Sequence, residues 1–440
     1  MSPTTVGVLL FVAMLALMAL RVPIAVAMFI PGAVGYVALA NEAALLNYLK
    51  GTAWARLSVY DLSVIPLFLL MGQFATQGGL SAALFRFANA VVGHFRGGMA
   101  MAAVIACAAF GSVSGSSVAT AATVAQVALP EMRRYHYSGR LSTATLAAGG
   151  TLGILIPPSV PLVVYAILAE QNIAKLFAAA FIPGIIAAIG YLAAIAIYVR
   201  LKPGYAPESR TFSPAEVRES AKDVWPVVVI FLVVFGGMYG GVFTPTEGAA
   251  VGAASTFLTA LLKRELTVEK TKLAFYGTAA TTGMIFMIFL GADMLNAALA
   301  LSQMPGKLAD TVTHLGLPPV AIVAAVLVFY VLLGMVMDEL AMLMLTIPVL
   351  FPAIMGLDLW GLGPSEKAIW FGILVLSIVE VGLIAPPVGL NVYVINSLSK
   401  DVPMAETYRG VVPFLVSDAV RLTLLLMFPI LTLWLVRMMN

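Results

Sequence analysis

Apolar runs that approach the length of a membrane-spanning helix make up most of the chain. Such a helix needs about 20 consecutive apolar residues, and uninterrupted runs predict helices, because the strands of a membrane barrel alternate apolar with polar residues. Of the 440 residues, 61% are hydrophobic and only 10% are charged, against roughly 25% charged residues in soluble domains. We therefore predict an all-α polytopic membrane protein. Its expected spans cover residues 4–20, 24–40, 62–77, 141–169, 180–199, 225–241, 246–262, 275–294, 368–397 and 411–436.

Positive charges lie in short clusters between the apolar runs, and the net charge is only +3. This pattern is typical of a membrane protein oriented with its Lys and Arg residues on the cytoplasmic side. It gives no sign of nucleic-acid binding. The loops around 200–222 and 263–272 are basic and are expected in the cytoplasm, with 201–224 as a linker. Counting the crossings places both termini in the periplasm, for a multi-pass protein of the bacterial inner membrane.

Two further apolar stretches are broken in the middle and are expected to form re-entrant hairpins. The stretch 98–130 is interrupted at 114–117 by Ser-Gly-Ser-Ser and has basic residues on both flanks, so both of its ends are expected in the cytoplasm. The stretch 318–356 is interrupted by Asp338 and Glu339 and lacks a basic cluster at either end, which favours entry from the periplasm. Both tips would then lie inside the membrane.

The chain also repeats itself, since three landmarks recur in one order at nearly one spacing. They are the span starts at Pro23 and Pro245, the hairpin glycines Gly111 and Gly334, and the Pro-Pro pairs at 157–158 and 386–387. We predict two halves, 1–200 and 225–440, each with five transmembrane helices and one hairpin. Because five is an odd number, the second half must be inverted relative to the first. Secondary transporters with such repeats place their site near the membrane midplane.

Amphipathic connectors occupy equivalent places in the two halves, at 42–58 and 263–275. Each mixes charged residues with apolar ones. Both are expected to lie along the membrane interface, where they would brace a moving part against a fixed one.

The tip of the first hairpin offers ligands at membrane depth. Irregular backbone is tolerated there only where it lines a cavity or is buried in protein. The tip supplies helix-end carbonyls for a cation and helix-start amides for an anion. The hydroxyl groups of Ser114, Ser116 and Ser117 suit either. Tight helix packing through small residues is the alternative, but the matching break in the second hairpin favours a site.

Asp338 and Glu339 are acids in the middle of an apolar run. Acids at bilayer depth are costly and usually functional. We expect Asp338 to neutralise a bound Na⁺, with proton transport as the open alternative, and Glu339 to pack against a serine or a backbone amide. Glu380, before the second Pro-Pro pair, is a weaker site candidate, and Glu247 is expected to cap the start of a helix.

The two Pro-Pro pairs interrupt spans and free backbone carbonyls. Proline has no amide hydrogen and clashes with the preceding turn, so carbonyls near Gly153 and Ile156, and near Gly382 and Ala385, lose their helical partners. Freed carbonyls are hard oxygen ligands suited to Na⁺, and a simple kink is the alternative. The polar residues just past the breaks, which either contact substrate or cap a helix, are Ser159 and Asn391.

The sequence contains few residues or motifs suited to catalysis or to binding a cofactor. Cys107 is the single cysteine, which excludes a disulfide within the chain. There is no GxxxxGK[ST] nucleotide loop, no cluster of His and Cys suited to a transition metal, and no apparent nucleophile–base pair. We expect a protein that is not an enzyme and holds no organic cofactor.

Five motifs together resemble the large membrane subunit of tripartite ATP-independent periplasmic (TRAP) transporters. The resemblance covers nearly the whole chain, and it is specific because the motifs occur together. They are Gly-Ser-Val-Ser-Gly-Ser-Ser at 111–117, Ile-Pro-Pro-Ser at 156–159, Gly-Val-Phe-Thr-Pro-Thr-Glu at 241–247, Met-Asp at 337–338 and Ala-Pro-Pro-Val-Gly at 385–389.

The resemblance implies a sodium-coupled member of the ion-transporter superfamily that works as an elevator, in which a transport domain with both hairpins slides against a scaffold domain. It implies two partners, a small four-helix membrane subunit, expected as a separate chain, and a periplasmic substrate-binding protein. The implied substrate is an organic acid such as a C4-dicarboxylate or sialic acid.

Carried over by motif, the resemblance implies two Na⁺ sites with the substrate between the hairpin tips. The first Na⁺ site would use Ser114, Ser116, Gly153, Ile156 and Pro158. The second would use Asp338, Gly382, Ala385 and Pro387. The substrate would lie near Ser117 and Asn391.

Other interpretations remain open at this point. A stand-alone carrier of the same superfamily, working without a binding protein, would share the repeats and the tips. A polytopic membrane enzyme would need a catalytic set, which the scarcity of His and Cys argues against. A channel is disfavoured because two hairpins from opposite sides suit alternating access. The sequence does not name the organic acid.

Overall fold

The computed structural model describes residues 2–207, 212–314, 316–335 and 337–439, and these form α-helices, two short 3₁₀ turns and no strand. Part of the predicted linker, 208–211, lies outside the described residues. The helices of the predicted first half are α1 (Pro3–Ala19), α2 (Ile24–Leu39), α3 (Glu42–Leu57), α4 (Val64–Gln77), α5 (Leu80–Val92), α6 (Gly98–Ser114), α7 (Ser117–Arg134), α8 (Gly139–Leu155), α9 (Val160–Leu168) and α10 (Ile173–Leu201). Those that follow are α11 (Pro214–Tyr239), α12 (Pro245–Leu262), α13 (Val268–Leu301), α14 (Met304–His314), α15 (Pro319–Gly334), α16 (Glu339–Met355), α17 (Pro364–Gly382), α18 (Leu390–Leu398), α19 (Met404–Met427) and α20 (Ile430–Met438).

Several helices have the length and composition of membrane spans. Among the described residues, α10, α11, α13 and α19 are each long and apolar enough, and two bent pairs raise the number to six. The bent pairs are α8–α9, at 42°, and α3 with the segment Tyr60–Gln77, at 56°. Large apolar side chains also point outward, such as Leu232 of α11, which is 61% exposed. Lipid is the solvent that such a surface requires, so the chain is a multi-pass membrane protein.

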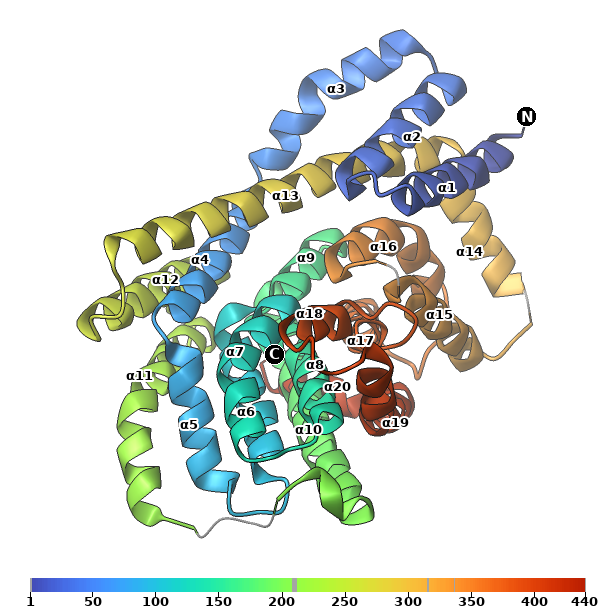
Figure 1. The fold of residues 1–440 in the computed structure, drawn as a ribbon. Helices are drawn as coiled ribbons and strands as arrows, with labels where there is room; N and C mark the ends of the chain where they lie inside the picture. Colours follow the sequence, from blue (N-terminus) through green and yellow to red (C-terminus); the bar gives the residue numbers. More distant parts are fainter. Residues whose placement is uncertain (1, 208–211, 315, 336, 440) are drawn as a thin grey trace.

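Most of the helices fall into two groups (Figure 1). In one, α13 lies along α2, α12 lies along α4, and α1 packs on α2; we call these five helices the α2–α13 layer. The other group, α6–α10 with α15–α20, is called the hairpin bundle. Its central helices are α8 and α17, which are buried from Leu141 to Leu155 and from Lys367 to Glu380. Both are buried all round, as core helices are.

Each predicted hairpin is a helix, a break and a second helix. The first consists of α6 and α7, which pack on each other and are joined by Gly115 and Ser116. The amide of Met99, near the start of α6, donates to the hydroxyl of Tyr137, just past α7, at 3.2 Å. Both ends of this pair therefore lie together, as a re-entrant hairpin requires. The second consists of α15 and α16, and within its break Val336 lies outside the described residues.

Three expectations about helix bounds are wrong. Part of the segment 263–275 belongs to α13, which runs unbroken for 34 residues, so it forms no separate connector. The run 411–436 is divided between α19 and α20, because Pro429 offers no amide hydrogen to continue the first helix. The short helices α5 and α14 were not predicted, since runs of 13 and 11 residues are too short for a span.

The other predicted connector, 42–58, is a separate helix, α3. It extends away from the hairpin bundle (Figure 1) and has no buried residue. Its anchor is Arg56, whose Nε lies 2.6 Å from Oδ2 of Asp293 on α13. The ion pair fastens the end of α3 to the long helix of the second half.

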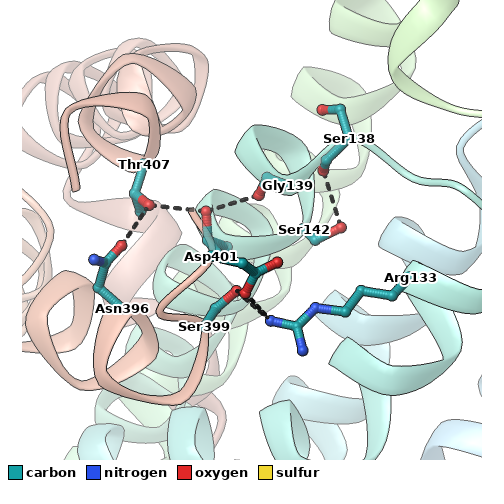
Figure 2. A network of polar contacts seen from close by, with 9 residues as sticks. Arg133, Ser138, Gly139, Ser142, Asn396, Ser399, Asp401 and Thr407 are labelled. Carbon is teal, nitrogen blue, oxygen red and sulfur yellow. Dashed lines mark hydrogen bonds and ion pairs between the residues drawn. The ribbon is translucent and has the colours of Figure 1, made fainter. Parts of the chain in front are cut away.

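A polar network joins the two halves at one end of the hairpin bundle (Figure 2). Arg133, at the end of α7, pairs with Asp401 in the α18–α19 loop. On the adjoining helices, Thr143 of α8 and Thr407 of α19 are hydrogen-bonded, with 2.9 Å between their hydroxyl oxygens. Thr407 also donates to Oδ1 of Asn396 at 3.1 Å. The α7–α8 turn and the α18–α19 loop therefore meet on the same side of the bundle.

Candidate functional site

The two hairpin breaks open onto one cavity of about 440 Å³. The first hairpin contributes Gly115 and Ser116, and the second contributes Asp338 and Glu339. Residues of α9 and α18, the helices after the two Pro-Pro pairs, complete this side, and residues of α4 and α13 form the opposite wall. The cavity thus lies between the hairpin bundle and the α2–α13 layer. Its volume is within the range of about 300–1,000 Å³ that is usual for small-molecule sites.

Four helices begin at this cavity. The first turns of α7, α9, α16 and α18 line it through Ala119, Val160, Leu340 and Leu390, respectively. A helix N-terminus carries roughly half a positive charge, and its unpaired amides bind anions. No Lys or Arg is among the described residues that line the cavity. Attraction for an anion therefore comes from the helix backbone.

The opposite charge comes from Asp338 and Glu339. Oδ1 of Asp338 accepts hydrogen bonds from the amides of Leu340 and Ala341, each at 2.9 Å, and so caps α16. Glu339 is only 7% exposed, and neither acid forms an ion pair within the described part of the chain. Two adjacent acids without a basic partner repel an anion. At this cavity the two acids therefore oppose the attraction of the helix N-termini for an anion.

Side chains cap two of the other three helix starts. Ser116 Oγ accepts from the amide of Ala119 at 3.4 Å, and Ser159 Oγ accepts from Leu162 at 3.5 Å. The residue before α18 is Gly389, whose φ of +54° is a left-handed conformation that favours glycine. Because glycine has no side chain, α18 starts at the cavity without a side-chain cap.

The helices that end at the two Pro-Pro breaks, α8 and α17, are called the interrupted helices. Each touches the hairpin of its own half through a pair of glycines. A Cβ atom on Gly111 of α6 would lie 2.7 Å from the Cα of Gly153 on α8. In the second half, a Cβ on Gly382 of α17 would lie 2.7 Å from the Cα of Gly334 on α15. No side chain fits at such distances, so the helices meet backbone to backbone. The same contact recurs at both predicted ion sites.

The structure brings residues of the first predicted Na⁺ site together. A Cβ on Gly153 would lie 2.8 Å from the carbonyl oxygen of Ser116. Ser114 Oγ lies 2.6 Å from Oγ1 of Thr120, and Pro158 is buried while Ile156 is half-buried. Their role as cation ligands stays a prediction.

The second predicted site differs from the first in the exposure of its Pro-Pro pair. Pro386 and Pro387 are exposed, whereas the equivalent Pro157 and Pro158 are buried. The carbonyl oxygen of Pro387 accepts a hydrogen bond from the Tyr408 hydroxyl at 2.7 Å. Gly382 and Ala385 are buried, and Asp338 lies at the cavity. Both Pro-Pro peptide bonds are cis.

Ser117, Ser159 and Asn391, predicted near the substrate, do not line the cavity in this structure. All three are fully buried. Ser159 caps α9, which is the alternative that the sequence left open, and Asn391 bonds to Ser117. Contact of these residues with substrate stays a prediction. Glu247 forms the predicted helix cap, a capping box with Thr244.

Sequence reasoning missed two sets of residues. Thr281 and Met284 line the cavity from α13, and Thr281 gives only the weak signal of a hydroxyl within an apolar run. Asp418 and Arg421 form a buried ion pair on α19. Their charges within an apolar run are the signal that marked Asp338, and the same signal could have found them.

The family described as "Tripartite ATP-independent periplasmic transporter, DctM component" matches residues 11–431. The chain belongs to this family. The match confirms the resemblance seen in the motifs, and the TRAP permease is a transporter and not an enzyme. Its cavity between two hairpin tips is accordingly a candidate transport site.

This TRAP permease is similar to two curated relatives in sequence and to one solved structure in fold. It is 37% identical over 357 residues to the C4-dicarboxylate TRAP transporter large permease protein DctM of Pseudomonas aeruginosa, covering 81% of each chain. It is 29% identical over 402 residues to the sialic acid TRAP transporter large permease protein SiaM of Vibrio cholerae, covering 91% of this chain and 92% of that one. The YdaH transporter of Alcanivorax borkumensis, at 15% identity, matches with a TM-score of 0.63 over 97% of this chain and 98% of its own. That likeness shows the fold alone.

Proposed function

We propose that this TRAP permease takes up an organic acid across the bacterial inner membrane, driven by the inward movement of Na⁺. The cavity between the hairpin tips carries the proposal, since four helix N-termini and two acids meet there. A C4-dicarboxylate is the first candidate substrate, because the C4-dicarboxylate relative is 37% identical and the sialic acid relative 29%.

The proposed coupling ion is Na⁺, since the ligands offered are hard oxygens. Pro157 and Pro386 supply no amide hydrogen to the carbonyls of Gly153 and Gly382. The Gly382 carbonyl is not freed as fully as the sequence predicted, because it still accepts a bond from the amide of Ala385 at 3.3 Å. Na⁺ bound at these carbonyls and at Asp338 would offset the negative charge at the cavity, so that the helix N-termini attract the substrate carboxylates. Ion and substrate would then favour each other's binding, which is a coupling free energy.

We further propose an elevator movement, with the α2–α13 layer as scaffold and the hairpin bundle as transport domain. In support, the bundle contains both hairpins, both interrupted helices and most of the cavity lining. The layer contributes only the facing wall, from α4 and α13. Sliding of the bundle along this wall would carry the bound substrate and ions across the membrane. The division into inverted halves at 1–200 and 225–440 belongs to the same proposal.

The proposed assembly contains a small four-helix membrane subunit and a periplasmic substrate-binding protein. Its support is membership of a family described as tripartite and periplasmic. With the basic loops in the cytoplasm, both termini of this permease would face the periplasm.

The test is uptake by liposomes that contain the permease, its small membrane subunit and its binding protein. Labelled C4-dicarboxylate and labelled sialic acid are supplied in parallel, with an inward Na⁺ gradient or with K⁺ alone. We expect uptake of the C4-dicarboxylate that needs both Na⁺ and the binding protein. Asp338→Ala should abolish it.

Three other outcomes would change the proposal. Uptake without the binding protein would favour a stand-alone carrier. A proton gradient that drives uptake equally well in K⁺ would overturn the sodium assignment and make Asp338 a proton carrier. Preference for sialic acid would overturn the substrate class but leave the coupling intact.

A further inference from the structure

A chain of buried polar side chains crosses the hairpin bundle away from the cavity. Glu380 of α17 lies 2.7 Å from Nη1 of Arg421 on α19, and Nη2 of Arg421 lies 3.0 Å from Asp418 on the same helix. The hydroxyl of Tyr191 on α10 donates to Asp418 at 2.9 Å and lies 3.3 Å from Oγ1 of Thr151 on α8. We call these five residues the crossing network. None of them is more than 2% exposed.

The two ends of the crossing network stand at equivalent places in the two halves. Thr151 lies two residues before Gly153, and Glu380 lies two residues before Gly382. These are the glycines that touch the hairpins and precede the Pro-Pro breaks. The network therefore connects the last turn of α8 with the last turn of α17, through two helices that contact both.

Packing alone does not explain the crossing network. Replacing a buried ion pair by apolar residues is often neutral or stabilising, so a charged cluster here is not required for a stable bundle. The cluster also holds two acids, Glu380 and Asp418, beside one cation, Arg421. Tyr191 adds a donor but no positive charge.

We propose that the crossing network couples the two cation sites, so that Na⁺ bound at one Pro-Pro break raises the affinity for Na⁺ at the other. The inference rests on the sodium coupling proposed above. Its residues touch neither ion nor substrate and act by positioning the last turns of α8 and α17. A shift of α8 or α17 moves its end of the network, and the buried chain of two hydrogen bonds and two ion pairs passes this shift to the other helix.

The test is the Na⁺ dependence of C4-dicarboxylate uptake in the liposomes that contain the complete transporter. Tyr191→Phe removes the central hydroxyl, and Thr151→Val removes the terminal one with little change of volume. Thr151→Ser keeps that hydroxyl and is the rescuing variant. Tyr165→Phe is the matched control, since Tyr165 is equally buried but donates to the carbonyl of Ala368, away from both breaks.

Wild type, Thr151→Ser and Tyr165→Phe should show a Hill coefficient for Na⁺ above one. In Tyr191→Phe and Thr151→Val it should fall towards one, with half-saturating Na⁺ raised at least about fivefold. The KM for substrate at saturating Na⁺ should not change, which separates lost coupling from general damage.

An unchanged Hill coefficient in both hydroxyl-deletion variants would overturn the inference, as would an equal change in Tyr165→Phe. A wild type with sodium-dependent uptake and a Hill coefficient of one would also overturn it, because there would be nothing to couple. A wild type without any sodium dependence would instead refute the proposed function. Should Tyr191→Phe fail to fold, the pair Thr151→Val and Thr151→Ser decides the question.

Discussion

Asn391 donates a hydrogen bond from Nδ2 to Oγ of Ser117 at 2.7 Å, although the two residues belong to opposite halves of the chain. The same nitrogen lies 3.1 Å from the carbonyl oxygen of Ala147. One side chain thus ties α18, which follows the second Pro-Pro pair, to the start of α7 and to α8. The halves are joined next to the candidate transport site.

Asn391→Ala should lower the free energy of unfolding by about 1–3 kcal/mol, because it leaves the buried Ser117 hydroxyl and the Ala147 carbonyl without this partner. The measurement is the midpoint of thermal unfolding in detergent. Ser397→Ala, an exposed change on the same helix, should leave the midpoint in place. Equal midpoints for both variants would show that the bond contributes nothing.

Gly111→Ala should separate α6 from α8, because its Cβ would lie 2.7 Å from the Cα of Gly153. Overpacking of this kind costs about 1–3 kcal/mol, and uptake should fall with it. The control is Gly236→Ala on α11, where nothing lies within 4 Å of the added atom. There, alanine should stabilise by up to about 1 kcal/mol. A stable, active Gly111→Ala variant would contradict the close helix contact.

Asp338→Asn should separate the capping role of this residue from its charge. Asparagine caps a helix about as well as aspartate, so the unfolding midpoint should change little. Uptake should nevertheless fall at least about tenfold, which corresponds to roughly 1.4 kcal/mol of lost cation binding. Asp338→Ala should lose the cap as well, at a further cost of about 0.5–2 kcal/mol. The measurement is a comparison of initial uptake rates and unfolding midpoints for the two variants. Normal uptake by Asp338→Asn would rule out a need for the charge.

Thr407→Val and Asp401→Ala should affect stability unequally, although both belong to the network in Figure 2. Thr407 is fully buried, and its hydroxyl serves Thr143 and Asn396, so its loss should cost about 1–3 kcal/mol. The Asp401 side chain is 61% exposed, and exposed ion pairs contribute less than about 1 kcal/mol. Denaturation of both variants measures the difference, and a larger loss from Asp401→Ala would reverse the assignment.

The sequence predicted well those features that depend on local chemistry. The two breaks at Ser114–Ser117 and Asp338 are visible because polar residues interrupt apolar runs, and the spans at α8–α9 and α17–α18 are divided where Pro-Pro pairs remove amide hydrogens. The cap at Glu247 follows from its spacing to Thr244. Each of these signals lies within a few residues of its effect.

Features that depend on distant contacts could not be predicted in this way. Asn391 looked like a substrate contact or a cap, and only the fold places Ser117 beside it. Thr281 faces the cavity because α13 runs past both hairpins. No local sequence pattern predicts this position. The absence of a break in α13, where the first half has one between α3 and α4, also depends on tertiary packing.

Because α13 is unbroken, the thickness of the bilayer can affect the wall of the cavity. At 1.5 Å per residue, its 34 residues extend for about 51 Å, well beyond a hydrocarbon core of about 30 Å. Such a rod adapts to bilayer thickness by tilting, and the wall of the cavity tilts with it, since Thr281 and Met284 belong to that wall. We therefore expect lipid chain length to be a physical variable of this transporter, and the shape of the cavity to depend on the membrane around it.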